Sequence, residues 1–357
     1  MTMLTQLEPD RVIIGVDTHD DVHVAVAIDL LGRRIDSIEI AVNRRGYCTL
    51  VEWAMSLGDI DAFGIEGTNS YGAGLARHLR AGDYLVIEVN CRNRQARRRN
   101  GKSDVADAEA AARAVLAGEA TAIPKAGNDH AEMIRVLRAA RVTAMKARTQ
   151  AVNTLRSLIV TAPCELREVL HGLSIPKLIA AAAQLSTDQP VDVTIANRVA
   201  MQGLACRYQD LDTEIAQLDQ HLDTLTEAAS HDLRAQFGVG PDVAGALIAA
   251  VGDNPDRIHT EAAFAMLCGV GPVQASSGKT SRHRLNRGGN RQANAALYRI
   301  ALVRLRWDDT TKQYADRRTT EGLSKREIIR CLKRYIAREL YPILAVIHTN
   351  PTAQIPA

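Results

Sequence analysis

Five short apolar runs near the start of the chain constrain its fold more than any other feature. The runs cover residues 12–17, 22–29, 37–42, 62–66 and 84–89. A turn at 31–34 connects the second run to the third, and helical stretches at 45–55 and 74–81 precede the fourth and the fifth. Three hairpin-linked strands followed by alternating helices and strands predict a mixed α/β sheet that helices cover.

Two of these runs end in an acidic residue. Asp17 closes the first and Glu66 closes the fourth, while Asp104 and Asp107 lie three apart in a segment of helical composition and so point to one side of it. A carboxylate at the end of a buried strand is costly unless a cation or a donor neutralises it. Converging oxygen ligands favour a divalent metal, usually Mg²⁺, and two such ions can stabilise both oxygens of an in-line phosphoryl displacement.

The second pair of acids also has a purely structural interpretation. Ser103 is placed to cap a helix that begins at residue 104. Asp104 and Asp107 would then interact favourably with the helix dipole in its first turn. This interpretation does not extend to Asp17 and Glu66, which lie at the ends of predicted strands.

The middle of the chain carries two long helical patterns. The first, within 131–160, has a heptad-like rhythm of small residues at Met133, Leu137, Ala140, Ala144, Ala147, Ala151, Thr154 and Leu158. The second is an a/d seam made of Leu204, Tyr208, Leu211, Ile215, Leu218, Leu222 and Leu225. Prolines interrupt shorter helical pieces between them. These patterns predict a helical arm over 131–228 in the form of an antiparallel coiled coil. We assign this arm a role in architecture and oligomerisation rather than in catalysis.

The last third of the chain is mainly helical in pattern. Helices are predicted at 243–251, 261–267, 291–305 and 325–340. Before the first of them, Gly238-Val239-Gly240 forms a turn into a helix end whose N–H groups suit a phosphate, as in helix–hairpin–helix elements that bind a DNA backbone. A plain turn between helices explains these residues equally well.

Charge is unevenly distributed along a chain whose net charge is only +3. Residues 262–307 contain eight Lys or Arg and no acid, and residues 92–102 contain six Lys or Arg and no acid. Such local excess is typical of a protein that binds a polyanion. A solvated basic face is the alternative for either run alone.

Other compositional features exclude several classes of protein. The six cysteines form neither a Cys-x-x-Cys pair nor a compact Cys/His cluster, which argues against a disulfide framework and a zinc site. The N-terminal residues lack a signal-peptide pattern, and no segment approaches the roughly 20 apolar residues that span a bilayer. We therefore expect a soluble cytoplasmic protein with no membrane partner.

A second chemical motif lies in the acid-free segment. Gly271-Pro272-Val273-Gln274-Ala275 leads into Ser276-Ser277-Gly278-Lys279, and further cations follow up to Arg291. A serine hydroxyl is a poor nucleophile unless a neighbour weakens its bond to the proton. Mg²⁺ or the arginines would have to do so and to stabilise the developing charge. Spacing alone slightly favours a loop that only contacts phosphate.

Together these motifs resemble a known family. The set Asp17, Glu66, Asp104 and Asp107 resembles the Asp-Glu-Asp-Asp set of the DEDD transposases of bacterial insertion sequences, the IS-one-ten family, which also includes the Piv-like DNA invertases. Residues 263–291, from the Gly269-Val270-Gly271-Pro272 step through Ser276-Ser277-Gly278 to Arg287-Gly288-Gly289-Asn290-Arg291, resemble the C-terminal transposase domain of that family. The resemblance covers nearly the whole chain in the same order.

The resemblance implies a domain layout and a chemistry. It implies a ribonuclease H-like (RuvC-like) domain at 1–125, a coiled-coil arm at 126–230 and a mainly helical transposase domain at 231–357. Members are recombinases in which a serine attacks DNA and forms a covalent phosphoserine link, with Mg²⁺ at the acids. The match to the Ser-Gly step makes Ser277 the expected nucleophile, and Ser276 is the alternative. The expected residence is the bacterial cytoplasm, at the nucleoid during action.

The resemblance also implies macromolecular partners. These are donor and target DNA, a structured non-coding bridge RNA that pairs with both, and further copies of the chain in a dimer or a tetramer on DNA that shares its active sites. The cations expected to contact nucleic acid are Arg92, Arg94, Arg97, Arg98, Arg99, Lys102, Lys279, Arg282, Arg284, Arg287 and Arg291. Two alternatives use the same residues differently: a RuvC-like nuclease with water as nucleophile, and a non-catalytic nucleic-acid-binding scaffold.

Overall fold

A computed structural model describes residues 11–90, 103–186, 189, 191–254, 258–276 and 283–346 of the chain. The contacts divide the chain into two compact units. The first unit comprises Met1–Asp129 and Val251–His259, and the second comprises His130–Ala250 and Thr260–Ala357. The division into three domains at 125/126 and 230/231 remains a prediction, since the arm and the C-terminal helices pack as one unit.

The first unit is built on a five-stranded sheet of order β3-β2-β1-β4-β5. The strands are β1 (Arg11–Thr18), β2 (Val22–Asp29), β3 (Arg34–Ala41), β4 (Asp59–Glu66) and β5 (Val86–Val89). The pairs β1–β2 and β2–β3 are antiparallel, whereas β1–β4 and β4–β5 are parallel. The predicted meander and mixed sheet are therefore confirmed, with β1 at the centre.

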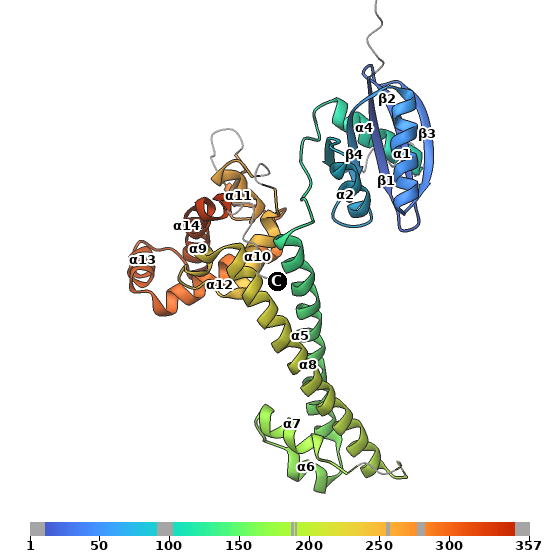
Figure 1. Cartoon of the computed structure of the whole chain (residues 1–357). Helices are drawn as coiled ribbons and strands as arrows, with labels where there is room; N and C mark the ends of the chain where they lie inside the picture. Colours follow the sequence, from blue (N-terminus) through green and yellow to red (C-terminus); the bar gives the residue numbers. More distant parts are fainter. Residues whose placement is uncertain are drawn as a thin grey trace, which may run out of the picture. The chain divides into compact units, whose positions relative to one another are not determined.

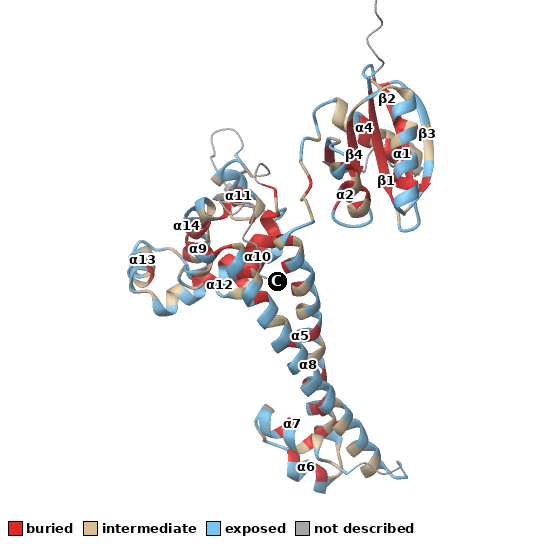
Figure 2. Cartoon of the chain, in the orientation of Figure 1, coloured by how far each residue is buried: buried red, intermediate tan, exposed pale blue. Residues whose placement is uncertain are grey.

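Helices cover both faces of this sheet (Figure 1). Helices α1 (Arg44–Leu57) and α2 (Ala73–Ala81) enclose a core on one face with buried Val12, Ile14 and Val16 of β1. Helix α4 (Asp104–Leu116) packs on the other face against Ile13 and its β2 neighbours. Alternate residues of β1 thus serve two cores, as expected for a strand with both faces covered. The central strands are buried along their length (Figure 2).

Residues 251–259 complete the first unit from far along the sequence. The side chain of Asn254 is buried, and its Nδ2 donates to the Pro124 carbonyl at 2.7 Å. Its Oδ1 accepts from the Ala126 backbone N–H at 2.5 Å. One amide side chain therefore satisfies a donor and an acceptor of the segment that follows α4.

Two long helices form an arm in the second unit (Figure 1). Helices α5 (His130–Thr161) and α8 (Val193–Ala229) run antiparallel, since Arg141 bonds Asp219 and Arg148 lies over the ring of Tyr208. Near the far end of the arm, α6 (Cys164–Leu170) and α7 (Ile175–Ala183) close an apolar cluster with both long helices.

The predicted seam of α8 faces inward, and that of α5 is partly wrong. All seven seam residues of α8 are buried or half-buried. In α5, Met133, Ala140 and Thr154 are exposed, and Ile134 and Leu155 occupy the buried face instead. Larger aliphatic side chains remove more apolar surface from water than alanine does, so they set the orientation of the helix. A coiled coil in the strict sense remains a prediction.

Among the residues that the structure describes, the rest of the second unit is helical apart from one pair of short strands. Its helices are α9 (His231–Arg234), α10 (Pro241–Val251), α11 (Glu261–Leu267), α12 (Arg291–Trp307), α13 (Asp309–Thr320) and α14 (Lys325–Val346). Strands β6 (Pro272–Gln274) and β7 (His283–Leu285) pair antiparallel. The four predicted helices are confirmed. Within the described residues, no helix combines the length and the hydropathy that crossing a bilayer requires.

Candidate metal centre

Asp17 and Glu66 lie side by side at one edge of the sheet. The last register pair between parallel strands β1 and β4 is Val16 with Ile65, and the next residues of the two strands are the acids. Side chains at one level of neighbouring strands point to the same face. A further link holds the strand ends together, because Thr18 Oγ1 donates to the Glu66 carbonyl at 2.8 Å. The two acids therefore share a face, as a common metal site requires.

Two glycines bring α4 against that face. A Cβ at Gly15 would lie 2.0 Å from the Ala108 carbonyl oxygen, and one at Gly64 would lie 2.7 Å from Val115 Cγ2 and 3.0 Å from the Ala111 carbonyl oxygen. Only a residue without Cβ permits this approach of helix and sheet. Each glycine lies two residues before an acid, and Gly15 is paired with Gly64, so the two glycines bring the first turn of α4 near the acids.

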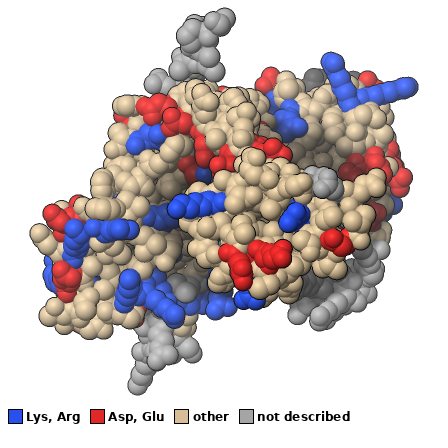
Figure 3. Space-filling view, turned by 90° about the horizontal axis from the view of Figure 1, so that it is seen from below, with Lys and Arg blue, Asp and Glu red and all other residues tan. Residues whose placement is uncertain are grey.

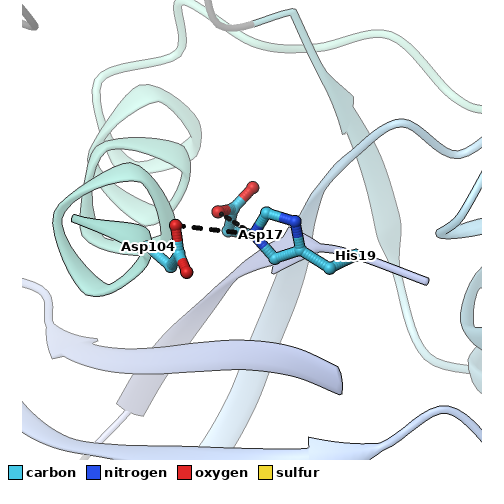
Figure 4. A group of neighbouring side chains, drawn as sticks. All are labelled: Asp17, His19 and Asp104. Carbon is cyan, nitrogen blue, oxygen red and sulfur yellow. Dashed lines mark hydrogen bonds and ion pairs between the residues drawn. The ribbon is translucent and has the colours of Figure 1, made fainter. Parts of the chain in front are cut away.

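Three side chains converge at this point (Figure 4). His19 Nε2 lies 3.1 Å from Asp17 Oδ2 and 3.5 Å from Asp104 Oδ1. One ligand atom from each of the three residues lies within 4.8 Å of the others. The side chain of Asp17 is 10% exposed, whereas those of His19 and Asp104 are 42% and 46% exposed. The group is therefore anchored in the core and open to solvent on one side.

His19 is the functional candidate that the sequence interpretation missed. It follows Asp17 by two residues, and residues i and i+2 of an extended chain face the same way. The i, i+2 spacing of Asp17 and His19 was the sequence feature that could have identified His19 as part of the site. An imidazole beside two carboxylates widens the set of suitable metals beyond Mg²⁺ to Mn²⁺ and other transition ions.

The electrostatics of the site centre on Asp17. Burial raises the pKa of its carboxyl group, the charges of Asp107 and Asp104 raise it further, and His19 opposes the rise. The resulting pKa lies above the ordinary value. A buried carboxylate with other acids beside it is one whose ionised state a divalent cation would stabilise. The donor set therefore fits a metal, although its role as a metal centre remains a prediction.

The other two predicted acids lie outside this compact group. Asp107 is buried one turn further along α4, and its charge acts on Asp17. Glu66 borders a cavity of about 410 Å³ at the carboxyl ends of β4 and β5. The cavity is also lined by Gly67, Asn69, Ser70, Glu88, Val89 and Asn90. The structure thus gathers Asp17, Asp104 and Asp107 and gives Glu66 the adjacent position on the sheet.

The proposed capping role of Ser103 is wrong in one respect. Ser103 is the residue before α4, but its side chain makes no capping hydrogen bond. Its backbone carbonyl instead accepts from the Asp107 N–H at 3.0 Å. Both acids do lie in the first turn of α4, so their favourable interaction with the helix dipole stays an alternative interpretation of this pair.

The serine segment belongs to the second unit. Ser276 is exposed and follows β6, while Ser277, Lys279 and Arg282 lie outside the described residues. Several contacts connect the segment after β7 to the end of α11. The Asn290 N–H donates to the Leu267 carbonyl at 2.6 Å, and a Cβ at Gly289 would lie 2.3 Å from the Gly269 nitrogen. The Gly-Gly-Asn motif therefore holds the segment after β7 against the end of α11.

The predicted cations are only partly described. Arg284, Arg287 and Arg291 are exposed, and the run from Arg92 to Lys102 lies outside the described residues. Basic and acidic side chains are interspersed on the face drawn in Figure 3. The Gly-x-Gly turn is followed by Asp242 in the first turn of α10. A carboxylate of the chain already occupies that helix end, which favours the plain interhelix turn.

A mixed sheet of this order, with acids on its central strands and on the helix against them, is consistent with the ribonuclease H-like class of DEDD domain. A family model described as "Transposase", the DEDD type of IS110, matches residues 14–162. A second, described as "Transposase IS116/IS110/IS902 family", matches residues 230–316. The chain belongs to the IS110 family of insertion-sequence transposases.

Two curated relatives support the family assignment. The "Insertion element IS900 uncharacterized 42 kDa protein" of Mycobacterium paratuberculosis is 29% identical over 183 residues, which cover 49% of this chain and 45% of the relative. The "Insertion element IS110 uncharacterized 43.6 kDa protein" of Streptomyces coelicolor is 32% identical over 131 residues, 36% of this chain and 32% of the relative. The chain matches less than half the length of each relative.

Proposed function

We propose that this chain is a DNA recombinase that moves an insertion sequence by metal-dependent transesterification. The observation that carries the proposal is the convergence of Asp17, His19 and Asp104 beside Asp107 and Glu66. Membership of a transposase family supports DNA as the substrate. The bacterial cytoplasm, at the nucleoid, is the proposed place of action.

The residues of the first unit have separate roles in this proposal. Asp17 and Asp104 would hold the cation, and Glu66 and Asp107 complete the acidic set around it. A bound divalent ion supplies Lewis-acid stabilisation of the phosphoryl oxygens. His19 holds the Asp17 carboxylate in place through the 3.1 Å contact and is available as a further ligand.

The second unit would supply the nucleophile. Ser277 Oγ forms a bond to the phosphorus atom of a DNA phosphodiester, and the bond from that phosphorus to the sugar oxygen breaks. The sugar oxygen leaves as a hydroxyl group and gains a proton in place of the one that the serine loses. The covalent link conserves the phosphodiester, so attack by another strand end can rejoin DNA without a further energy source. Ser276 is the alternative nucleophile.

The proposed partners follow the family. They are donor and target DNA, a bridge RNA that selects both, and other copies of the chain in a dimer or a tetramer. The exposed arginines at 284, 287 and 291 support a polyanionic partner. The antiparallel arm offers a long surface for association between copies.

The test is capture of a protein–DNA adduct. The protein is incubated with the DNA of its element, the adjoining non-coding RNA and Mn²⁺ or Mg²⁺, then denatured and separated by electrophoresis. We expect an adduct that Ser277→Ala abolishes and that Asp17→Asn also abolishes. Asp20→Asn is the matched control, because Asp20 is an exposed acid in the turn after β1.

Each other outcome has a defined meaning. An adduct that persists in both Ser277→Ala and Ser276→Ala defeats the serine assignment. Cut DNA ends without any adduct would select the hydrolytic nuclease. DNA binding that is indifferent to Asp17 and to metal, with no cleavage, would select the non-catalytic scaffold.

A further inference from the structure

A cavity of about 580 Å³ lies within the second unit, where α5, α10 and α12 meet. Five cations line it, and they come from two helices far apart in sequence. The cations are Arg138, Arg141 and Lys146 of α5 and Arg291 and Arg299 of α12, and Asp242 of α10 also lines the cavity. Its volume is in the range of cavities that bind small molecules, which includes a nucleotide-sized group.

One carboxylate organises the inner part of this cavity. Asp242 accepts from Arg138 Nε at 3.0 Å and from Arg299. Burial raises the pKa of Asp242, but the two guanidinium groups outweigh it, so the pKa is below its ordinary value. The side chain of Arg138 is only 5% exposed, and its Nη1 donates to Gln292 Oε1 at 2.6 Å. The inner wall is therefore fixed by a hydrogen-bonded network across three helices.

The outer cations differ from the inner ones. Arg141 pairs with Asp219 of α8. Lys146 and Arg291 are exposed and make no hydrogen bond or ion pair within the described part of the chain. Five cations against two carboxylates leave an excess of three positive charges around one hollow. Clustered like charges repel one another, and a bound anion would relieve that repulsion.

We propose that this cavity binds the sugar–phosphate backbone of a nucleic-acid strand. Lys146 and Arg291 make the outer phosphate contacts beside Arg141, and Arg299 faces the strand from the inner wall. Guanidinium and ammonium groups are the usual protein partners of phosphate. Val142, Met145 and Ala295 give the hollow an apolar side against which a sugar or a base can lie. The proposal rests on the proposed function and adds a backbone site remote in sequence from the DEDD acids.

Photo-crosslinking tests where the strand lies. Benzoylphenylalanine replaces Met145 in the cavity wall or, as the control, Val160, which is 61% exposed on the same helix. Labelled duplex DNA, single-stranded DNA and an RNA hairpin are the separate probes, and a chelator prevents cleavage. We expect crosslinking from position 145 and little from position 160, and the efficient probe identifies the source of the backbone. Equal crosslinking from both positions, or none from 145, would overturn the proposal.

A salt titration of binding tests the charges. The double variant Lys146→Gln/Arg291→Gln is compared with the control Lys177→Gln/Arg156→Gln. The control removes two exposed cations of the arm that likewise form no ion pair among the described residues. We expect the cavity pair to weaken binding by roughly twenty-fold and to lower the slope of log K against log salt by about 1.4–1.8. The control pair should change the affinity and the salt slope by less than the cavity pair does. Equal effects in the two pairs would refute the assignment.

The same titration separates this proposal from its alternatives. If polyglutamate competes as strongly as nucleic acid does, the ligand of the cavity would be an acidic peptide, and the proposal of a sugar–phosphate site would be overturned. Loss of cleavage in Asp17→Asn together with unchanged binding by the cavity pair would leave the proposed function standing and remove the cavity site. If the Lys146→Gln/Arg291→Gln variant binds nucleic acid more weakly but the parent protein shows no metal-dependent cleavage, the cavity site would stand and the proposed function would fall.

Discussion

Substitution of Gly15 by alanine tests the close approach of α4 to the sheet. The new Cβ would lie 2.0 Å from the Ala108 carbonyl oxygen and 2.4 Å from the Ala112 nitrogen. Since such contacts are not seen below 3.0 Å, a 2.0 Å contact obliges the helix to move by roughly 1 Å. Overpacking costs about 1–3 kcal/mol, and the upper end applies here because both contacts are backbone atoms that cannot rotate away.

The same shift would displace the candidate metal ligands. Asp104 is the first residue of α4, so a movement of the helix separates it from Asp17. A misplacement of this size costs about a hundred-fold in a reaction that depends on aligned groups. We therefore expect Gly15→Ala to weaken Mn²⁺ binding and strand cleavage as well as the stability of the first unit.

Trp53 fluorescence measures the stability during urea denaturation. The chain has two tryptophans, and Trp307→Phe leaves only the one in α1 of the first unit. Gly203→Ala is the control, since that position in α8 of the second unit has nothing within 4 Å, so this substitution should leave the Trp53 transition of the first unit unchanged. A Gly15→Ala protein with the parent's stability and Mn²⁺ affinity would refute the packing argument.

Three further outcomes are expected. Asp242→Ala should destabilise the second unit by about 3 kcal/mol, measured by urea denaturation, because it leaves Arg138 buried without its carboxylate. The pKa of Asp242 is lowered in the folded state, so its contribution is complete above the unfolded pKa of about 4 and is lost as the pH falls through the folded value. Acid titration should therefore destabilise the parent more than Asp242→Ala. Asp104→Asn should weaken Mn²⁺ binding in calorimetry by roughly ten-fold or more, and an unchanged affinity would remove Asp104 from the ligand set.

The sheet was predictable because its signals are local. Each strand is a short apolar run, and β1 to β3 follow one another through tight turns, so pairing needs no long-range information. The positions of Asp17 and Glu66 at strand ends followed from the same runs. Their common face depends on the parallel register of β1 and β4, which the sequence could only suggest.

Other features depend on contacts between distant segments. His19 becomes a candidate only when α4 brings Asp104 within 3.5 Å. Helix α13 is largely polar, with only Thr311 buried, so it lacks the apolar rhythm that predicts a helix, and Asp308 caps it. The inward face of α5 was ambiguous because alanines occupy one stripe and larger residues such as Ile134 occupy the next.

The contribution of Asn254 to the first unit bears on how the protein is made. A ribosome releases the five strands and α4 early, but the amide that bonds Pro124 and Ala126 comes only after the entire arm. During synthesis the segment after α4 must therefore wait for its partner, and a fragment that stops at residue 129 would never receive it.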